Sequence, residues 1–419
     1  MRPSPPASLA VLALVAALAG CGKSQPAQTT GGASASLAAP SAGGVLGVAT
    51  KNTTRVGPGD PVLTAAAVSR AAYPGLTATT RPQAVVLVDL HNWAAALACS
   101  ALASAPLSAP LLYSDGDTLP KASAQALEAM HPAGDSMLAG TQVIEVGDAT
   151  AVPAGYRASA AATGTDPAST AAALEGLVSA IRATPLRSVI VLAVEAPRAY
   201  QMPAAGLAAE SGAPILFVDA AGVPAPTAAV LSRLRGPHMY LIDADAIGPH
   251  ARSELARYGP ISDVSRGSAV SGAPTGTAPA PARAAGESAA DNAIAVARFS
   301  DGTFGWGVKE PGHGLVFASS KRPLDAPAAA LLSGSGDYGP LLLLESPGTL
   351  PLALSHYLSD IQPAYGSAPQ FQPVHGAYNH GWLIGAEESI SALAQAEIDS
   401  LLEIVPTQAP EATSESTSE

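Results

Sequence analysis

The chain is poor in cysteine, aromatic residues and charge, and each shortage narrows what it can be. Its two cysteines are too few for a framework of disulfide bonds. Aromatic residues make up 4% of the sequence and charged residues 13%, whereas hydrophobic residues make up 48%. A core with so few rings has to be packed from Ala, Val, Leu and Ile, so we expect close contacts between helices and sheets.

Positive charge is also scarce, with 21 Lys and Arg against 33 Asp and Glu, a net charge of −12. Nucleic-acid binding selects basic surfaces, so we expect no nucleic-acid partner. Phosphate-binding glycine loops, nucleophile elbows and paired-histidine zinc motifs are missing from the sequence. His375 and His380 stand in a segment without cysteine or paired acids, and we interpret them as loop residues. We therefore expect a non-catalytic protein without cofactor or metal.

The first 21 residues have the features of an export signal. Arg2 supplies a positive charge, residues 9–18 form a short apolar run, and Leu18-Ala19-Gly20-Cys21 follows. This tetrad resembles the lipobox of bacterial lipoproteins. The resemblance implies cleavage before Cys21, diacylglycerol and palmitate at that residue, and a stable membrane anchor. The alternative is an ordinary secretory signal with a chance cysteine.

Low-complexity composition marks the segments outside the expected folded part. Residues 22–50 are rich in Ser, Ala, Gly and Thr, and we expect a disordered spacer. Residues 406–419 hold mainly Pro, Ser, Thr and Glu, and we expect a disordered tail. No later apolar stretch reaches the roughly 20 residues that a transmembrane helix needs.

One pattern recurs three times along the rest of the chain. At residues 85–120 an apolar run, an alanine-rich helical stretch and a second apolar run follow one another, and the same order returns at 189–224 and 315–351. Apolar runs separated by helices are typical of parallel strands buried on both faces. The sequence therefore predicts an α/β fold of three tandem Rossmann-like or flavodoxin-like repeats with short parallel sheets. Their first strands are expected near 85–88, 189–193 and 315–318.

The repeats set the expected domain boundaries. Repeat one covers residues 51–154, repeat two covers 155–264 and repeat three covers 287–405. Residues 265–286 are rich in Gly, Pro and Ala, and we interpret them as a linker or surface loop. Each repeat is long enough to enclose a core of its own.

These repeats resemble the cell wall-binding repeat 2 family over nearly the whole exported chain. The family opens with an Arg-x-x-Gly-x-Asp segment and Thr-Ala, and carries Ala-Pro-Ile-Leu-Leu at its second strand. The matching residues here are Arg55 to Asp60 with Thr64-Ala65, and Pro110-Leu111-Leu112, Pro214-Ile215-Leu216 and Pro340-Leu341-Leu342. The sequence departs from the family at Pro61-Val62, where Arg-Tyr is usual, and at the final Gly-Gly, which is reduced to Gly147-Asp148 in repeat one.

The resemblance implies a pseudo-threefold arrangement and non-covalent attachment to an anionic cell-wall polymer, either a polysaccharide or a peptidoglycan-linked polymer. The protein would then sit in the cell membrane by its lipid, facing the extracytoplasmic space or wall. The acidic total charge opposes this mode of binding unless positive charge is concentrated locally.

Candidate ligand residues lie where the first strand of each repeat ends. Asn92, Gln201 and Asp325 stand near the start of the following helix, at the carboxyl ends of the strands, where open α/β sheets bind ligands. Helix capping is the simpler explanation of these side chains. Arg198, Lys321 and Arg322 could supply positive charge to the same loops. Cys99 is interpreted as a small buried hydrophobic residue.

Two other functions stay open. A solute-binding lipoprotein of a transporter also joins a lipobox to Rossmann-like lobes, and a polar pocket between lobes would favour it. A scaffold that binds a partner envelope protein is the other. A cell-wall hydrolase is disfavoured because the repeats leave no room for a catalytic domain.

Overall fold

The computed structural model describes residues 48–147, 152–161, 164, 166–265, 288–334, 338–365 and 378–406. The predicted signal peptide with Cys21, most of the spacer and nearly all of the linker and tail lie outside these residues, as does His375. Within them, no helix combines the length and apolar character that crossing a membrane would require.

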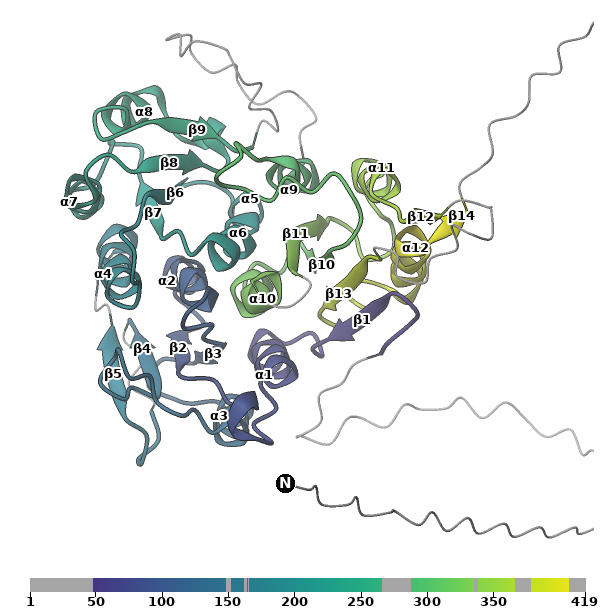
Figure 1. Ribbon diagram of the computed structural model, residues 1–419, viewed down its shortest axis with the longest axis horizontal. Helices are drawn as coiled ribbons and strands as arrows, with labels where there is room; N and C mark the ends of the chain where they lie inside the picture. Colours follow the sequence, from purple (N-terminus) through teal and green to yellow (C-terminus); the bar gives the residue numbers. More distant parts are fainter. Residues whose placement is uncertain are drawn as a thin grey trace, which may run out of the picture. The chain divides into compact units, whose positions relative to one another are not determined.

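The first lobe is a four-stranded parallel sheet whose central strand is the apolar run predicted at residues 85–88 (Figure 1). Its elements are β2 (Val85–Asp89), α2 (Trp93–Ala98), the 3-10 helix η2 (Cys99–Ala103), β3 (Leu111–Ser114), α3 (Lys121–Met130), β4 (Val143–Val146) and β5 (Ala158–Ala161). The strand order is β3-β2-β4-β5. Helix α1 (Pro61–Ala72) packs on β3 and α3, and the 3-10 helix η1 (Ala78–Thr80) precedes β2.

The second lobe repeats this plan with the strand order β7-β6-β8-β9. Its elements are α4 (Pro167–Ala180), β6 (Ser188–Ala193), α5 (Arg198–Gln201), α6 (Pro203–Ser211), β7 (Ile215–Val218), α7 (Ala225–Leu234), β8 (His238–Leu241), η3 (Ala244–Ala246), α8 (Pro249–Leu255) and β9 (Ile261–Asp263). All paired strands run parallel. This order of strands matches the start of a flavodoxin-like sheet, as the sequence predicted.

The third lobe has the order β11-β10-β13-β1, so its sheet includes the first strand of the chain. Its elements are α9 (Ala289–Arg298), β10 (Gly314–Ser319), α10 (Asp325–Ser333), β11 (Tyr338–Leu344), α11 (Leu352–Asp360), β13 (His380–Ile384), α12 (Ala392–Leu402) and β1 (Thr53–Val56). A short parallel pair, β12 (Ala364–Tyr365) with β14 (Val405–Pro406), lies outside this sheet.

Two of the sheets are offset from the sequence repeats, because the first and third sheets take their fourth strand from the opening segment of another repeat, whereas β9 of the second sheet ends repeat two itself. Strand β5 lies in the segment assigned to repeat two yet pairs with β4, and β1 of repeat one pairs with β13 of repeat three. After each fourth strand the chain forms a helix that packs on the next lobe, namely α4, α9 or α1. These helices begin alike, with a side-chain cap from Asp166, Ser288 or Asp60. The stretch assigned as a linker therefore stands between β9 and α9, inside the repeated unit.

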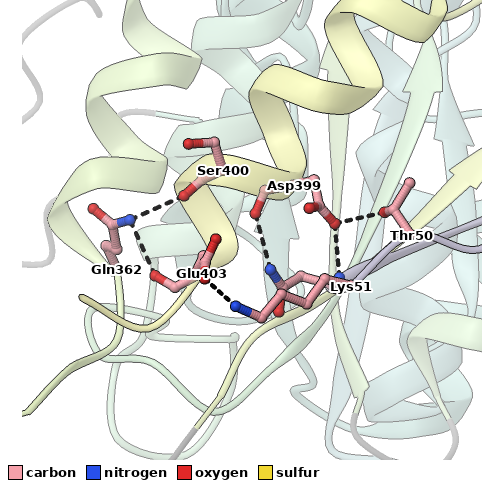
Figure 2. Close-up of polar contacts among 7 residues, drawn as sticks. Thr50, Lys51, Gln362, Asp399, Ser400 and Glu403 are labelled. Atoms are coloured by element: carbon pink, nitrogen blue, oxygen red, sulfur yellow. Dashed lines mark hydrogen bonds and ion pairs between the residues drawn. The ribbon is translucent and has the colours of Figure 1, made fainter.

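Polar contacts hold the start of the folded chain against helix α12 (Figure 2). The Asp399 carboxylate accepts hydrogen bonds from the Thr50 hydroxyl at 2.5 Å and from the Asn52 backbone N–H at 2.7 Å. Lys51 forms an ion pair with Glu403. Deeper in the lobe, the buried Arg55 guanidinium donates to the Gly385 carbonyl at 3.0 Å and the Ile390 carbonyl at 2.6 Å. Together with β1, these contacts join the first and last repeats.

Small side chains fill the contacts among the lobes, as the composition predicted. Helix α6 packs against α10 and η2, and α10 also packs against α1. Gly206 of α6 lies so close to α10 that a Cβ atom would come within 2.8 Å of the Ser333 hydroxyl. The buried alanines of these helices are Ala65, Ala66, Ala101, Ala103, Ala204, Ala205, Ala208, Ala209, Ala326, Ala328, Ala329 and Ala330.

Candidate functional site

The loops predicted to bind a ligand follow β2, β6 and β10, the first strand of each sheet. In the first lobe this loop is closed by Asn92, which caps α2 by accepting a hydrogen bond from the Ala95 N–H at 3.0 Å. The capping explanation considered from the sequence therefore describes what the Asn92 oxygen does in the fold. Asp325 and Gln201 do not cap their helices, and each makes a different contact.

Gln201 joins the first and second lobes. Its side-chain oxygen accepts a hydrogen bond from the Trp93 indole N–H at 2.6 Å, and its amide donates to the Ala193 and Ala196 carbonyls at 2.8 and 3.1 Å. The side chain is buried. Its hydrogen-bonding groups are thus engaged within the protein, where they fix the indole ring of the neighbouring lobe.

Asp325 is fully buried and forms a two-pronged ion pair with Arg322, with N–O distances of 2.7 and 3.2 Å. Burial raises the pKa of the Asp325 carboxyl to about 6, and the guanidinium of Arg322 only partly opposes this. Beside it, the Tyr113 hydroxyl of the first lobe donates to the Leu324 carbonyl at 2.7 Å. The Arg322–Asp325 pair lies within the third lobe and holds the loop whose Leu324 carbonyl accepts this hydrogen bond from the first lobe.

Among the predicted cations, Arg198 and Lys321 have exposed side chains. The Arg198 guanidinium lies 5.9 Å from the centre of the Trp93 ring, a cation–π contact across the first two lobes. The structure thus places Gln201 and Arg198 in contacts with Trp93 of the first lobe and pairs Arg322 with Asp325 within the third lobe. Arg198 and Lys321 remain accessible to solvent.

The carboxyl edge of the sheets, where these loops lie, is crowded with acidic residues. An aspartate or glutamate follows nearly every strand, because these residues cap helices and loops where backbone N–H groups point outward. The acids in or directly after the ends of the strands include Asp60, Asp89, Asp115, Asp117, Asp166, Glu195, Asp219, Asp243, Asp245, Asp263, Asp325, Glu345, Glu387 and Glu388. An anionic ligand at this edge would meet repulsion from most of its surroundings.

The opposite, amino edge of the sheets carries most of the positive charge of the described residues. Helices end at this edge, and their carboxyl termini favour cations. The cations in the segments that lead into the strands are Lys51, Arg70, Arg81, Arg157, Arg182, Arg187, Arg233, Arg235, Arg257, Arg298 and Lys309. None of these was among the six residues predicted to bind a ligand, although Arg70, Arg157 and Arg298, with Arg55 and Arg322, are the arginines that the sequence offers as candidates for a local basic groove. The sequence nevertheless contains a repeated signal for cations at this edge, since Arg81, Arg187 and Lys309 stand shortly before β2, β6 and β10.

Two cavities open at the amino edge, in equivalent positions between lobes. One lies between the second and third lobes, has a volume of about 480 Å³, and is lined by polar and charged residues that include Arg182, Arg187 and Glu210. The other lies between the third and first lobes, has a volume of about 490 Å³, and is lined by Tyr73, Tyr378 and Trp382. Both are of a size that binds small molecules, roughly 300–1,000 Å³.

The remaining candidates from the sequence have ordinary surroundings. Cys99 is a free, buried cysteine, and burial raises the pKa of its thiol, as expected of a core residue. His380 begins β13, where its ring meets Trp382 edge to face. No group of three or more metal-ligating side chains is gathered anywhere in the described part of the chain.

The fold is similar to that of two proteins of known structure. Cwp8 from Clostridium difficile matches with a TM-score of 0.60 and 16% sequence identity, over 84% of this chain and 52% of that chain. Cwp6 from Clostridium difficile matches with a TM-score of 0.59 and 16% identity, over 84% of this chain and 48% of that chain. This chain thus spans about half the length of each, 52% and 48%. No family model and no curated protein sequence matches it. The likeness is one of fold, and it agrees with the α/β repeat architecture that the sequence predicted.

Proposed function

We propose that this chain is a non-catalytic, lipid-anchored protein of the cell envelope that attaches to an anionic cell-wall polymer. The observation that carries this proposal is that exposed cations without an ion-pair partner among the described residues, Arg187, Arg257 and Lys309, stand at the amino edge, because they provide local positive charge on an acidic protein. The lipobox tetrad ending in Cys21 supports the anchor, and the fold shared with the cell wall proteins Cwp8 and Cwp6 supports a place at the cell surface.

Local positive charge is what makes such binding physically reasonable here. With a net charge of −12, uniform mixing would leave every face negative. Instead most of the cations precede the strands, where acids such as Asp135, Glu310 and Asp360 also lie, so positive charge at the amino edge is concentrated only around individual residues. Arg187, Arg257 and Lys309 at the amino edge are exposed and have no ion-pair partner among the described residues, which leaves their charges available.

Sedimentation with purified sacculi tests the proposal. The soluble part, residues 24–406, is expected to sediment with sacculi, to lose this binding after acid extraction of the wall polymers, and to dissociate as salt rises. Binding that is unchanged by extraction or by salt would contradict an anionic polymer and would favour a partner protein instead.

A comparison of the two edges locates the binding surface. Replacing Arg187, Arg257 and Lys309 with alanine is expected to weaken sacculus binding about tenfold or more, equivalent to roughly 1.4 kcal/mol. Replacing the exposed carboxyl-edge cations Arg198 and Lys321 serves as the matched control and is expected to have little effect. If the Arg198 and Lys321 replacements weaken binding and the amino-edge replacements do not, the binding surface is formed by the loops predicted from the sequence.

A second candidate function, that of a solute-binding lipoprotein, is favoured by the polar cavity between the second and third lobes. Such a cavity is the feature expected to distinguish it from a polymer-binding scaffold. The chemistry of its lining defines what kind of solute would fit.

A further inference from the structure

The cavity between the second and third lobes brings together three segments that lead into strands. Arg182, Arg187 and Ser188 precede and begin β6, Glu210 ends α6, and Ser300 and Thr303 belong to the loop between α9 and β10. Its volume of about 480 Å³ suits a small ligand. The same cavity is therefore lined by positively charged side chains, Arg182 and Arg187, and by a carboxylate, Glu210.

The walls of this cavity are fixed by their own contacts. Asp301 accepts hydrogen bonds from the Tyr240 hydroxyl at 2.7 Å and from the backbone N–H groups of Thr303 and Phe304 at 2.9 and 2.8 Å. Burial alone would raise the pKa of the Asp301 carboxyl, but these hydrogen bonds lower it to about 2. The Phe304 ring stacks on Tyr240 with centroids 3.8 Å apart. A ligand would thus meet a loop that is already ordered.

Arg182 is held in a similar way, because its guanidinium donates to the Gly212 carbonyl at 3.0 Å. Arg187 and Glu210 differ from these neighbours. Among the described residues neither side chain has a hydrogen bond or ion pair, and they do not pair with each other. Burial raises the pKa of the Glu210 carboxyl, and no nearby cation offsets this effect. A half-buried carboxylate without a partner is costly, and a ligand cation would relieve that cost.

The equivalent cavity between the third and first lobes shows that these charges do not follow from the fold itself. It is lined by Tyr73, Leu331, Leu332, Tyr378 and Trp382, with no arginine or glutamate. Elements in the same structural positions thus present aromatic and aliphatic side chains there. The charge of the first cavity is a property of its own residues.

We propose that the cavity between the second and third lobes binds a small zwitterion, a group that carries an ammonium together with a carboxylate or a phosphate. Glu210 receives the ammonium, and Arg187 with Arg182 receives the anion. The hydroxyl groups of Ser188 and Thr303 complete a polar lining. This assignment goes beyond attachment to a wall polymer and does not depend on it, since it concerns a ligand that fills one cavity.

Calorimetric titration of the full chain in detergent tests this assignment, with alanylalanine and phosphoethanolamine as probes. These separate a carboxylate source of the anion from a phosphate source. Glu210→Gln and Arg187→Ala are each expected to weaken binding of the better probe about tenfold or more. Glu310→Gln and Lys121→Ala, at exposed positions outside the cavity, are the controls and are expected to bind as the unaltered chain does.

Acetylation of the probe's amine gives the sharper result, because it removes the charge that Glu210 is proposed to receive. It should weaken binding to the unaltered chain about tenfold and have almost no further effect on Glu210→Gln. Failure of both probes to bind would overturn the assignment. An equal loss on acetylation in both proteins would overturn it as well. Neither result changes the expectation for sacculus binding, so the two proposals are tested independently.

Discussion

At the scale of single residues, polar side chains that resemble ligand-binding groups in the sequence serve as connections between lobes. Gln201 fixes the Trp93 indole, and the Asp325–Arg322 pair lies beside the Tyr113 contact. Each of these side chains stands after a strand, where a ligand site was expected. They are buried there because the lobes meet at the same place.

Asp325 gives this arrangement a measurable pH dependence. Its pKa is raised from 3.8 to about 6 in the fold, mainly by burial, while Arg322 opposes the shift and Asp60 adds to it. The folded protein therefore binds this proton more tightly than the unfolded chain. Stability from this group is fully present below about pH 4 and is lost as the pH rises through 6, by on the order of 3 kcal/mol.

Asp325→Asn is accordingly expected to flatten the fall in the free energy of unfolding between pH 4 and 7. Urea unfolding at several pH values measures this, with the exposed Glu310→Gln as control. The difference in unfolding free energy between Asp325→Asn and the unaltered chain is then plotted against pH. If this difference is constant over the range, the pKa of the Asp325 carboxyl is not raised in the folded protein.

At the scale of elements, the contact between α6 and α10 depends on the absence of a side chain at Gly206. A Cβ there would lie 2.8 Å from the Ser333 hydroxyl and 3.4 Å from the Leu341 N–H nitrogen. Ser333 is itself buried and has little room to move. Backbones can approach closely at this point only because both helices present small residues.

Gly206→Ala is therefore expected to lower the free energy of unfolding by about 1–2 kcal/mol, since overpacking outweighs the gain in helix propensity. Gly176 of α4 is the matched control, because a Cβ there meets nothing within 4 Å. Gly176→Ala is expected to raise stability by about 0.5–1 kcal/mol. Urea midpoints that move in the same direction for both variants would contradict this explanation.

At the scale of the whole molecule, the third sheet is completed by β1, a strand from the start of the folded chain that pairs with β13 near its end. Strand β1 supplies the edge of that sheet, and the Asp399 and Glu403 contacts secure it (Figure 2). The proposed anchor at Cys21 precedes β1 in the sequence, with the expected spacer, residues 22–50, between them.

Cys21 itself is the subject of the prediction at this scale. We expect Cys21→Ser to abolish incorporation of a palmitate analogue in metabolically labelled cells, because the thiol is the proposed site of acylation. Cys99→Ser is the matched control, since Cys99 is the other cysteine and is buried. Label that persists in Cys21→Ser would exclude the anchor.

The sequence by itself predicted the three α/β units, because apolar runs typical of buried parallel strands alternate with alanine-rich helical stretches in the same order three times. It did not reveal β1, β5 and β9, which read TTRV, ASAA and ISD and have no strong apolar pattern. The edges they pair with exist only in the folded protein. The tertiary structure also determined that two of the predicted ligand residues, Gln201 and Asp325, are buried where the lobes meet and are not open to a ligand. The direction of the strands then placed most of the cations at the amino edge, since all strands of a parallel sheet start at one edge and end at the other.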